Sequence, residues 1–147
     1  MATMKKYKKI LVAVDLSGEA HQVLQRAREL AECFGAKLQL VHVIEPVALN
    51  SPYELTPSLP SNMQAVLVER AEEFLTQLAK DFALSEVPRT VHVGSTKQYI
   101  LQTAQDSEID LIVTGTHGRH GIGLLLGSTA TSVLHGTPCD VYAVKIQ

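Results

Sequence analysis

Short apolar runs alternate with amphipathic helical patterns along this chain, and this alternation limits its fold more than any other feature. Residues 10–14 (ILVAV) and 111–113 (LIV) are apolar without interruption. Such runs are typical of central strands in a parallel sheet, where helices cover both faces. The sequence therefore predicts an α/β fold in which helices join parallel strands.

Five strands and four helices are expected in strict alternation. The strands are expected at residues 9–15, 37–44, 87–93, 110–114 and 140–146, and the helices are expected to begin near residues 17, 61, 95 and 128. This order predicts one doubly wound, five-stranded parallel sheet with right-handed crossovers. The strand order 3-2-1-4-5 fits, because Pro88 places the polar third strand at an edge, and the apolar first and fourth strands then lie at the centre.

The helix ends carry recognisable capping signals. Ser17 is expected to cap the first helix, with Glu19 in its first turn and Gly35 at its end. Residues 61–64 and 95–98 have the S-x-x-Q pattern of a capping box. The inward faces are expected to carry Ala20, Val23, Leu24, Ala27, Leu30, Ala31 and Phe34 in the first helix, Met63, Val66, Leu67, Ala71, Phe74, Leu75, Leu78 and Phe82 in the second, and Ile100, Leu101 and Ala104 in the third.

Length and composition suit one cytoplasmic domain covering residues 1–147. A net charge of −2 argues against nonspecific nucleic-acid binding, and no apolar run reaches the roughly 20 residues of a membrane span. The first apolar run stops at Asp15, too soon for a signal peptide. Cys33 and Cys139 form no C-x-x-C motif, and Cys33, on an apolar helix face, is interpreted as a buried structural thiol.

Residues 45–60 interrupt the alternation with four prolines and little periodicity. Loops of this length inside compact domains are usually functional or disordered. Two interpretations stay open for this segment, a surface loop and a lid over a ligand site.

A glycine-rich stretch, residues 115–128 (GTHGRHGIGLLLGS), joins the fourth strand to the fourth helix. Its glycines let the backbone approach a ligand closely, and its end places N–H groups at a helix N-terminus, where anions are favoured. The strand order reverses between strands one and four, so Asp15 and this loop fall in one crevice, where ligands of such sheets bind. We interpret the loop as a phosphate cradle, although glycine-rich loops also occur as plain connectors.

The loop is neither a Walker A motif, which needs G-K-[ST], nor the dinucleotide fingerprint, which should follow the first strand. Phosphate charge would then be met by backbone amides, the helix terminus, Arg119 and a divalent metal such as Mg²⁺. Arg119 could equally be a solvated charge, and Asp15 could bind a ribose or a metal or simply close its strand. His117 and His120 lack a third ligand for zinc.

The remaining polar residues give little sign of catalysis. His42 and His92 are interpreted as structural histidines on strands. The sequence has no G-x-S-x-G nucleophile elbow and no assignable triad, so no catalytic residue is expected. Slow hydrolysis of bound ATP stays open.

The chain resembles the universal stress protein family from end to end. The resemblance rests on residues 9–17 (KILVAVDLS), 40–44 (LVHVI), 110–118 (DLIVTGTHG), 126–128 (LGS) and the closing strand after Pro138. It implies the doubly wound, Rossmann-like fold of the adenine nucleotide alpha hydrolase type, with dimerisation through the last strand.

The resemblance also implies a nucleotide site. Members that bind ATP carry G-x2-G-x9-G-[ST], in which the loop holds the triphosphate, the acid matching Asp15 lies by the adenosine, and the backbone matching Val43 contacts adenine. The positions implied here are Val14, Asp15, Val43, Val113, Gly115, Gly118, Arg119, Gly127, Ser128 and Thr129. The spacing in this chain is one residue shorter, G-x2-G-x8-G-S, as in a family branch that lost the glycines and does not bind ATP; this chain keeps them.

The last strand is apolar, and no helix follows it. An exposed edge of this kind invites pairing with another chain, so we expect a homodimer in which residues 141–146 pair antiparallel with their copy. The interface is expected to use Val141, Tyr142, Ala143, Val144 and Ile146. Lys145 could instead keep the edge monomeric. Three functions stay open: a dimeric ATP-binding regulator of stress responses, a non-nucleotide-binding stress protein acting through protein partners, and a weak ATPase or transferase.

Overall fold

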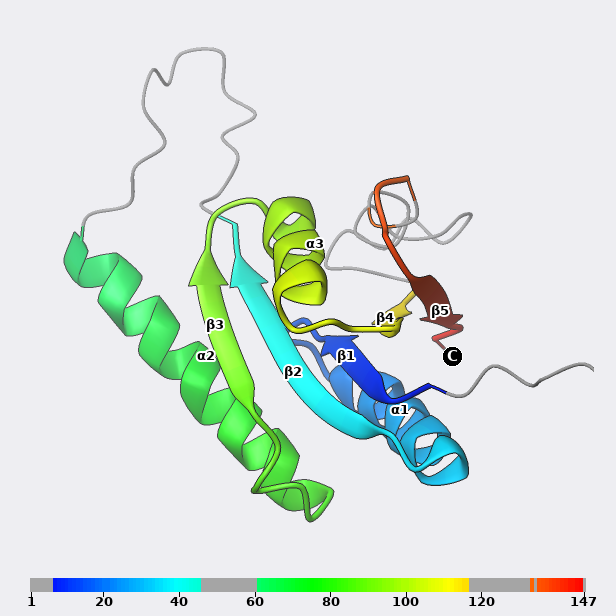
Figure 1. The fold of residues 1–147 in the computed structure, drawn as a ribbon. Helices are drawn as coiled ribbons and strands as arrows, with labels where there is room; N and C mark the ends of the chain where they lie inside the picture. The colour runs from blue at the N-terminus through cyan, green and yellow to red at the C-terminus, as the bar shows by residue number, and fades with distance from the viewer. Residues whose placement is uncertain (1–6, 46–60, 117–132, 134, 147) are drawn as a thin grey trace, which may run out of the picture.

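The computed structural model describes residues 7–45, 61–116, 133 and 135–146. The elements are β1 (Lys9–Ala13), α1 (Ala20–Phe34), β2 (Lys37–Ile44), α2 (Ser61–Asp81), β3 (Arg89–Val93), α3 (Thr96–Asp106), β4 (Leu111–Gly115) and β5 (Asp140–Val144). All strand pairs are parallel, and they form one five-stranded sheet in the order β3-β2-β1-β4-β5 (Figure 1). The predicted fold class and strand order are confirmed.

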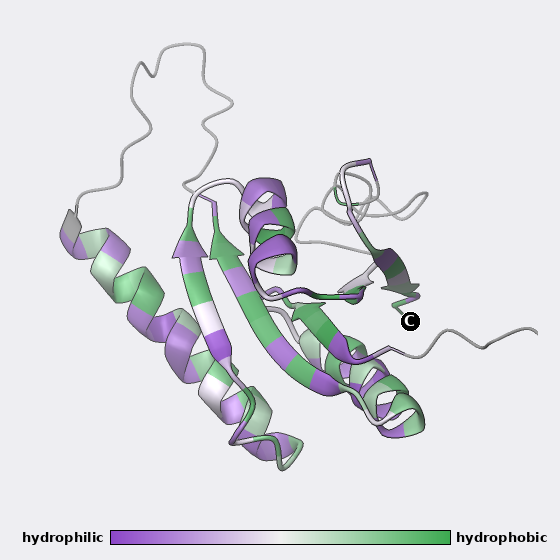
Figure 2. Cartoon of the chain, in the orientation of Figure 1, coloured by the Kyte–Doolittle hydropathy of each residue, from purple (hydrophilic) through white to green (hydrophobic). Residues whose placement is uncertain are grey.

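The sheet separates two hydrophobic clusters, and β1 contributes to both. Ile10 and Val12 pack in the cluster that contains α1 and α2, and Leu11 packs in the cluster that contains α3. All three side chains are 0% exposed. Burying one such side chain contributes roughly 1.5–3 kcal/mol, so the uninterrupted apolar run stabilises both layers at once. Figure 2 shows β1 as hydrophobic along most of its length, in contrast to the mixed edge strand β3.

Two of the predicted helix ends are confirmed. Gly35 ends α1 with a left-handed backbone (φ 65°), and its N–H donates to the carbonyl of Ala31. At the start of α3, the Ser95 hydroxyl accepts from the backbone N–H of Gln98 at 3.3 Å. These are the C-terminal and N-terminal caps that the sequence signals predict.

The cap predicted at Ser17 is wrong. Helix α1 begins at Ala20, and Glu19 occupies the cap position without a side-chain capping bond. The Ser17 hydroxyl instead accepts from the Glu19 N–H and donates to the Asp15 carboxylate, because the acid lies within reach two residues earlier. Ser17 therefore shapes the turn after β1.

The predicted apolar face of α2 is correct only in its second half. Met63 and Val66 are 50% and 45% exposed, whereas Ala71, Leu75 and Leu78 are buried. The helix has 21 residues, about 30 Å, while the edge strand β3 has five, about 17 Å. The apolar pattern therefore continues beyond the strand that gives the helix its cover.

The burial predicted for Cys33 is also wrong, because this thiol is exposed. Cys33 follows the buried Ala31 by two residues, which is about 200° around the helix and hence on its outer side.

Strand β5 forms one edge of the sheet and, within the described residues, pairs only with β4. The pairing continues past the strand ends, since Thr116 N–H donates to the Val144 carbonyl at 2.9 Å and Ile146 N–H donates to Thr116 Oγ1 at 3.2 Å. Tyr142 is 38% exposed on this strand. Pairing of this edge with a second copy stays a prediction.

Three segments of interest lie wholly or largely outside the described residues. They are residues 46–60, the glycine stretch from 117 onward, and the fourth helix apart from Val133. Val133 is helical and 0% exposed, and it packs in the cluster that contains α3. Across the described ranges, no helix is both long and apolar enough to cross a membrane.

Candidate functional site

The carboxyl ends of β1 and β4 leave the sheet side by side. The register aligns Val12 with Val113, so Val14 and Gly115, two residues further on, reach the same edge. The chain turns back from β1 toward β2 and from β4 toward β5, in opposite directions along the sheet. This is the strand-order reversal at which open α/β sheets bind ligands.

Asp15 lies at this edge in a turn closed by its own side chain. Its Oδ1 accepts from the Ser17 backbone N–H at 3.2 Å and from the Ser17 hydroxyl at 2.5 Å. A carboxylate oxygen that binds the backbone two residues on makes an Asx turn. Asp15 is half-buried, and none of the described residues donates to its Oδ2. The second oxygen is thus available to a hydroxyl or a cation.

Three valines of the implied nucleotide site have their side chains buried in the core. Val14, Val43 and Val113 are 5%, 8% and 0% exposed, and all three belong to the hydrophobic clusters. The Val14 N–H donates to the Val41 carbonyl at 3.0 Å, and its carbonyl accepts from His42 Nδ1 at 2.8 Å. No motif or periodicity in the sequence predicts the bond from His42.

A side chain at position 115 would be tightly packed. A Cβ at this position would lie 3.2 Å from Val23 Cγ2 and 3.4 Å from Ile146 Cδ1. The β4 backbone therefore passes close to α1 and to the last residues of the chain just before the glycine stretch. The remaining predicted phosphate residues, Gly118, Arg119, Gly127, Ser128 and Thr129, lie outside the described residues, as do His117 and His120.

The nearby N-terminus of α3 is already satisfied by the protein itself. Glu45 Oε1 accepts from Thr96 N–H at 3.0 Å, and Ser95 caps the same turn. A carboxylate in this position occupies the place that an anion would take. Glu45 is not among the residues predicted from the sequence, although, like Asp15, it is an acid directly after a strand.

His92 has the structural role expected of it. Its ring stacks on Tyr99 with the ring centroids 4.5 Å apart and an angle of 11° between the planes. His42 likewise has a satisfied bond, to the Val14 carbonyl, so both histidines have partners within the fold.

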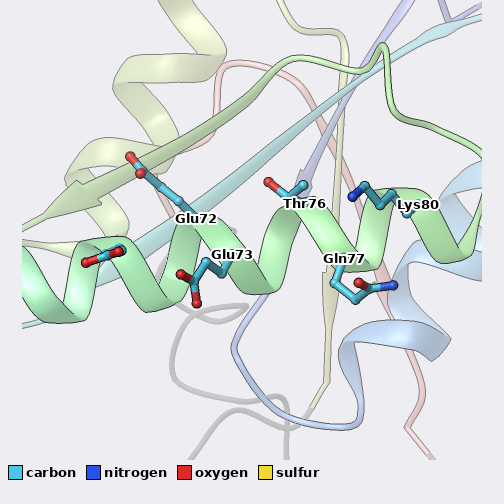
Figure 3. A pocket seen from close by; sticks show the side chains of 6 residues that line it. Glu72, Glu73, Thr76, Gln77 and Lys80 are labelled. Carbon is cyan, nitrogen blue, oxygen red and sulfur yellow. The ribbon is translucent and has the colours of Figure 1, made fainter.

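Two surface grooves lie away from this edge. One, of about 380 Å³, follows a single helix, and Figure 3 shows its side chains projecting from α2; it is lined by Glu69, Glu72, Glu73, Thr76, Gln77 and Lys80. The other, of about 400 Å³, is lined by Arg28, Ala31, Glu32, Ala36, Lys37, Leu38, Leu84, Glu86, Val87 and Pro88. Neither is lined by a residue expected to bind nucleotide.

The described part of the chain holds no cluster of three or more His, Cys, Asp or Glu side chains that could bind a metal. Mg²⁺ commonly takes one or two carboxylates together with phosphates and waters. Asp15 therefore suits Mg²⁺ only in company with a phosphate ligand.

Comparison with known proteins gives consistent matches along the whole chain. The sequence model of the universal stress protein family matches residues 6–145. Universal stress protein A homolog 2 of Coxiella burnetii is 39% identical over 146 residues, which cover 98% of this chain and 99% of the relative.

Solved structures of universal stress proteins also match this chain. Universal stress protein UspA from Lactobacillus plantarum is 29% identical with a TM-score of 0.80, covering 96% of this chain and 99% of that one. A universal stress protein solved in complex with cAMP shares the fold at 23% identity and a TM-score of 0.61, covering 96% and 98%.

Proposed function

The chain belongs to the universal stress protein family, and we propose that it is a dimeric, ATP-binding regulator of stress responses in the cytoplasm. The observation that carries the proposal is the Asp15 carboxylate just beyond β1, beside the end of β4. Its Oδ2 is unbonded by the described residues, whereas Oδ1 is held by Ser17. An acceptor held in this way at the strand-order reversal favours a bound ligand.

The proposed ligand is adenosine triphosphate with Mg²⁺. The backbone of Val43 would contact the adenine, Val14 and Val113 would lie at the nucleotide site, and Asp15 would take a ribose hydroxyl or share the metal with a phosphate. Gly115, Gly118, Arg119, Gly127, Ser128 and Thr129 would hold the triphosphate. Gly121 and Gly123 would let the loop, one residue shorter than the family spacing, still close on it.

Mass spectrometry of nucleotide released from the purified protein tests this proposal, together with calorimetry against Mg-ATP. We expect ATP or AMP to be released and heat to be measured on titration. cAMP belongs in the ligand panel because a protein of the same fold was solved with it. Absence of released nucleotide and of heat would reject ATP binding and favour the family branch that acts through partner proteins.

Two variants test the contributions of the glycine stretch and of the Asp15 turn separately. Gly118→Val should abolish ATP binding and leave the fold intact, because a side chain there blocks close approach of the backbone. Asp15→Asn is the matched control for the turn, since the amide keeps an oxygen that Ser17 can reach while the negative charge is lost. We expect its ATP affinity to fall with little change in the melting temperature.

The proposed dimer forms through β5, with Val141, Tyr142, Ala143, Val144 and Ile146 at the interface. Support comes from the position of β5 at the sheet edge and from the exposure of Tyr142. Size-exclusion chromatography with light scattering should give a mass twice the 16.0 kDa of one chain. A 16 kDa species at micromolar concentration would reject the dimer.

A further inference from the structure

His42 joins the middle of β2 to the residue that follows β1. Its Nδ1 lies 2.8 Å from the carbonyl oxygen of Val14, and the ring is half-buried. A carbonyl oxygen can only accept, so Nδ1 carries the hydrogen. The bond therefore selects one tautomer of the ring and one direction for the Val14 carbonyl.

Both backbone groups of Val14 are thus held by β2. The Val14 N–H donates to the Val41 carbonyl at 3.0 Å, and the Val14 carbonyl accepts from the His42 side chain. The carbonyl of Val14 and the N–H of Asp15 belong to one planar peptide unit. Fixing this carbonyl consequently fixes the plane from which Asp15 extends.

The Asp15 side chain is also held by Ser17, two residues further along the chain. Ser17 engages Oδ1 through its N–H and its hydroxyl, while Oδ2 is unbonded by the described residues. With His42 before it and Ser17 after it, the carboxylate has one direction in which it can present the second oxygen.

We propose that His42 is a positioning residue for the recognition of a ribose hydroxyl by Asp15. It acts by holding the Val14–Asp15 peptide, and its effect on affinity rests on the nucleotide binding proposed above. The neighbouring histidine shows the contrast: His92 pairs in register with Val43 but stacks on Tyr99, a packing role.

Asparagine and glutamine at position 42 provide a matched pair of variants. The asparagine amide nitrogen is bonded to Cγ, as Nδ1 is, so His42→Asn keeps the donor in place. His42→Gln moves the donor one bond further, and His42→Leu removes it. Val91→Ala is the control for general loosening, because Val91 pairs with His42 in register on β3.

The first measurement compares dissociation constants for Mg-ATP and for Mg-2′,3′-dideoxy-ATP, which lacks the ribose hydroxyls. In His42→Gln and His42→Leu we expect Mg-ATP to bind more weakly by at most about tenfold, because His42 acts through Asp15 and the loss cannot exceed that of one hydrogen bond to a charged group. We also expect the preference for ATP over the dideoxy analogue to shrink. His42→Asn and Val91→Ala should keep that preference. An unchanged preference in His42→Gln and His42→Leu, or an equal loss in Val91→Ala, would overturn the proposal.

The second measurement needs no nucleotide, so it separates failure of this proposal from failure of the proposed function. Nitrogen-15 NMR of the wild type should show the ring of His42 protonated at Nδ1. Hydrogen exchange at the Ser17 amide, which donates to Asp15, should be faster in His42→Gln and His42→Leu than in His42→Asn and Val91→Ala. Equal exchange in all four variants would reject the positioning role, even if the wild type binds ATP.

Discussion

Two aspartates flank the central strands β1 and β4 at opposite ends of the sheet. Asp110, just before β4, uses both carboxylate oxygens within the fold: Oδ2 accepts from Lys8 N–H at 2.9 Å and Oδ1 from Lys9 N–H at 3.2 Å. Asp15, just after β1, engages only Oδ1, in its own turn. The same side chain beside the same pair of strands thus holds the fold together at one end and leaves an acceptor at the other.

The difference shows how to interpret an acid beside a central strand. A carboxylate whose two oxygens both bind backbone N–H groups has a structural task, and it ties together segments that are distant in sequence. A carboxylate with one oxygen left can bind a ligand without giving up its structural bond. The number of engaged oxygens, rather than position beside the sheet, separates the two roles.

The largest expected effect is on stability, from Asp110→Ala. Removing two charge-assisted bonds that fasten the start of β1 should lower the free energy of unfolding by about 2 kcal/mol and the melting temperature by about 4–8 °C. Thermal unfolding followed by circular dichroism measures this change, and Mg-ATP affinity should stay the same below the transition. A loss of affinity comparable to that of an Asp15 variant would contradict the assignment of a purely structural role to Asp110.

Asp15→Ala should have the next largest effect, and it should change ligand affinity more than stability. We expect the dissociation constant for Mg-ATP to rise about tenfold, or 1.4 kcal/mol. The free energy of unfolding should fall by no more than about 1 kcal/mol, because the two bonds that are lost both come from Ser17 and lie within one local turn. Calorimetry and chemical unfolding of the same preparation measure both quantities. A large stability loss with unchanged affinity would make Asp15 a second structural acid.

Ser95→Ala should have a smaller effect, about 1 kcal/mol of stability, because it removes the cap of α3. Its hydroxyl is already engaged, like the oxygens of Asp110, so Mg-ATP affinity should not change. Urea unfolding and calorimetry check the two expectations. Ser95→Thr is the control, since threonine keeps a capping hydroxyl.

The smallest effect is expected at a third aspartate, Asp81, which is exposed at the end of α2. Hydrogen bonds from Gln77 and then from His21 hold the pKa of Asp81 below its ordinary value of 3.8. A carboxyl whose pKa is lower when folded contributes stability above its unfolded pKa, and this is lost as pH falls through the folded pKa. Asp81→Asn should therefore lower the melting temperature slightly at neutral pH and not in acid. An equal difference at both pH values would exclude titration of Asp81 as the cause.

Much of the fold could be predicted because the apolar pattern of most elements matches the face that is buried in the tertiary structure. The apolar run of β1 and the helical spacing of α1 both point to the buried face that the structure shows. The burial predictions fail at Met63 and Val66, where α2 extends beyond the strand that covers it. They also fail at Cys33, an exposed helix position within an apolar stretch. Local pattern cannot show how far a sheet extends beneath a helix.

The candidate site can be predicted from the sequence only in part, for a similar reason. The place of Asp15 follows from strand order alone, so the sequence suffices for it. The bond from His42 to Val14 joins residues 28 positions apart, and it depends on a side-chain direction that no periodicity encodes. The engagement of both Asp110 oxygens depends in the same way on a partner about 100 residues earlier in the chain.

That long separation has a consequence during synthesis. The Lys8–Asp110 bond joins residues 102 positions apart, and β1 cannot pair on its second side until β4 has been made. At about 5–20 residues per second, a nascent chain spends seconds with β1, four of whose five residues are buried in the folded domain, as an open sheet edge. Such edges are where chains pair with the wrong partner. In the folded domain β4 covers this edge of β1, so the hazard at this edge belongs to the time before β4 is made.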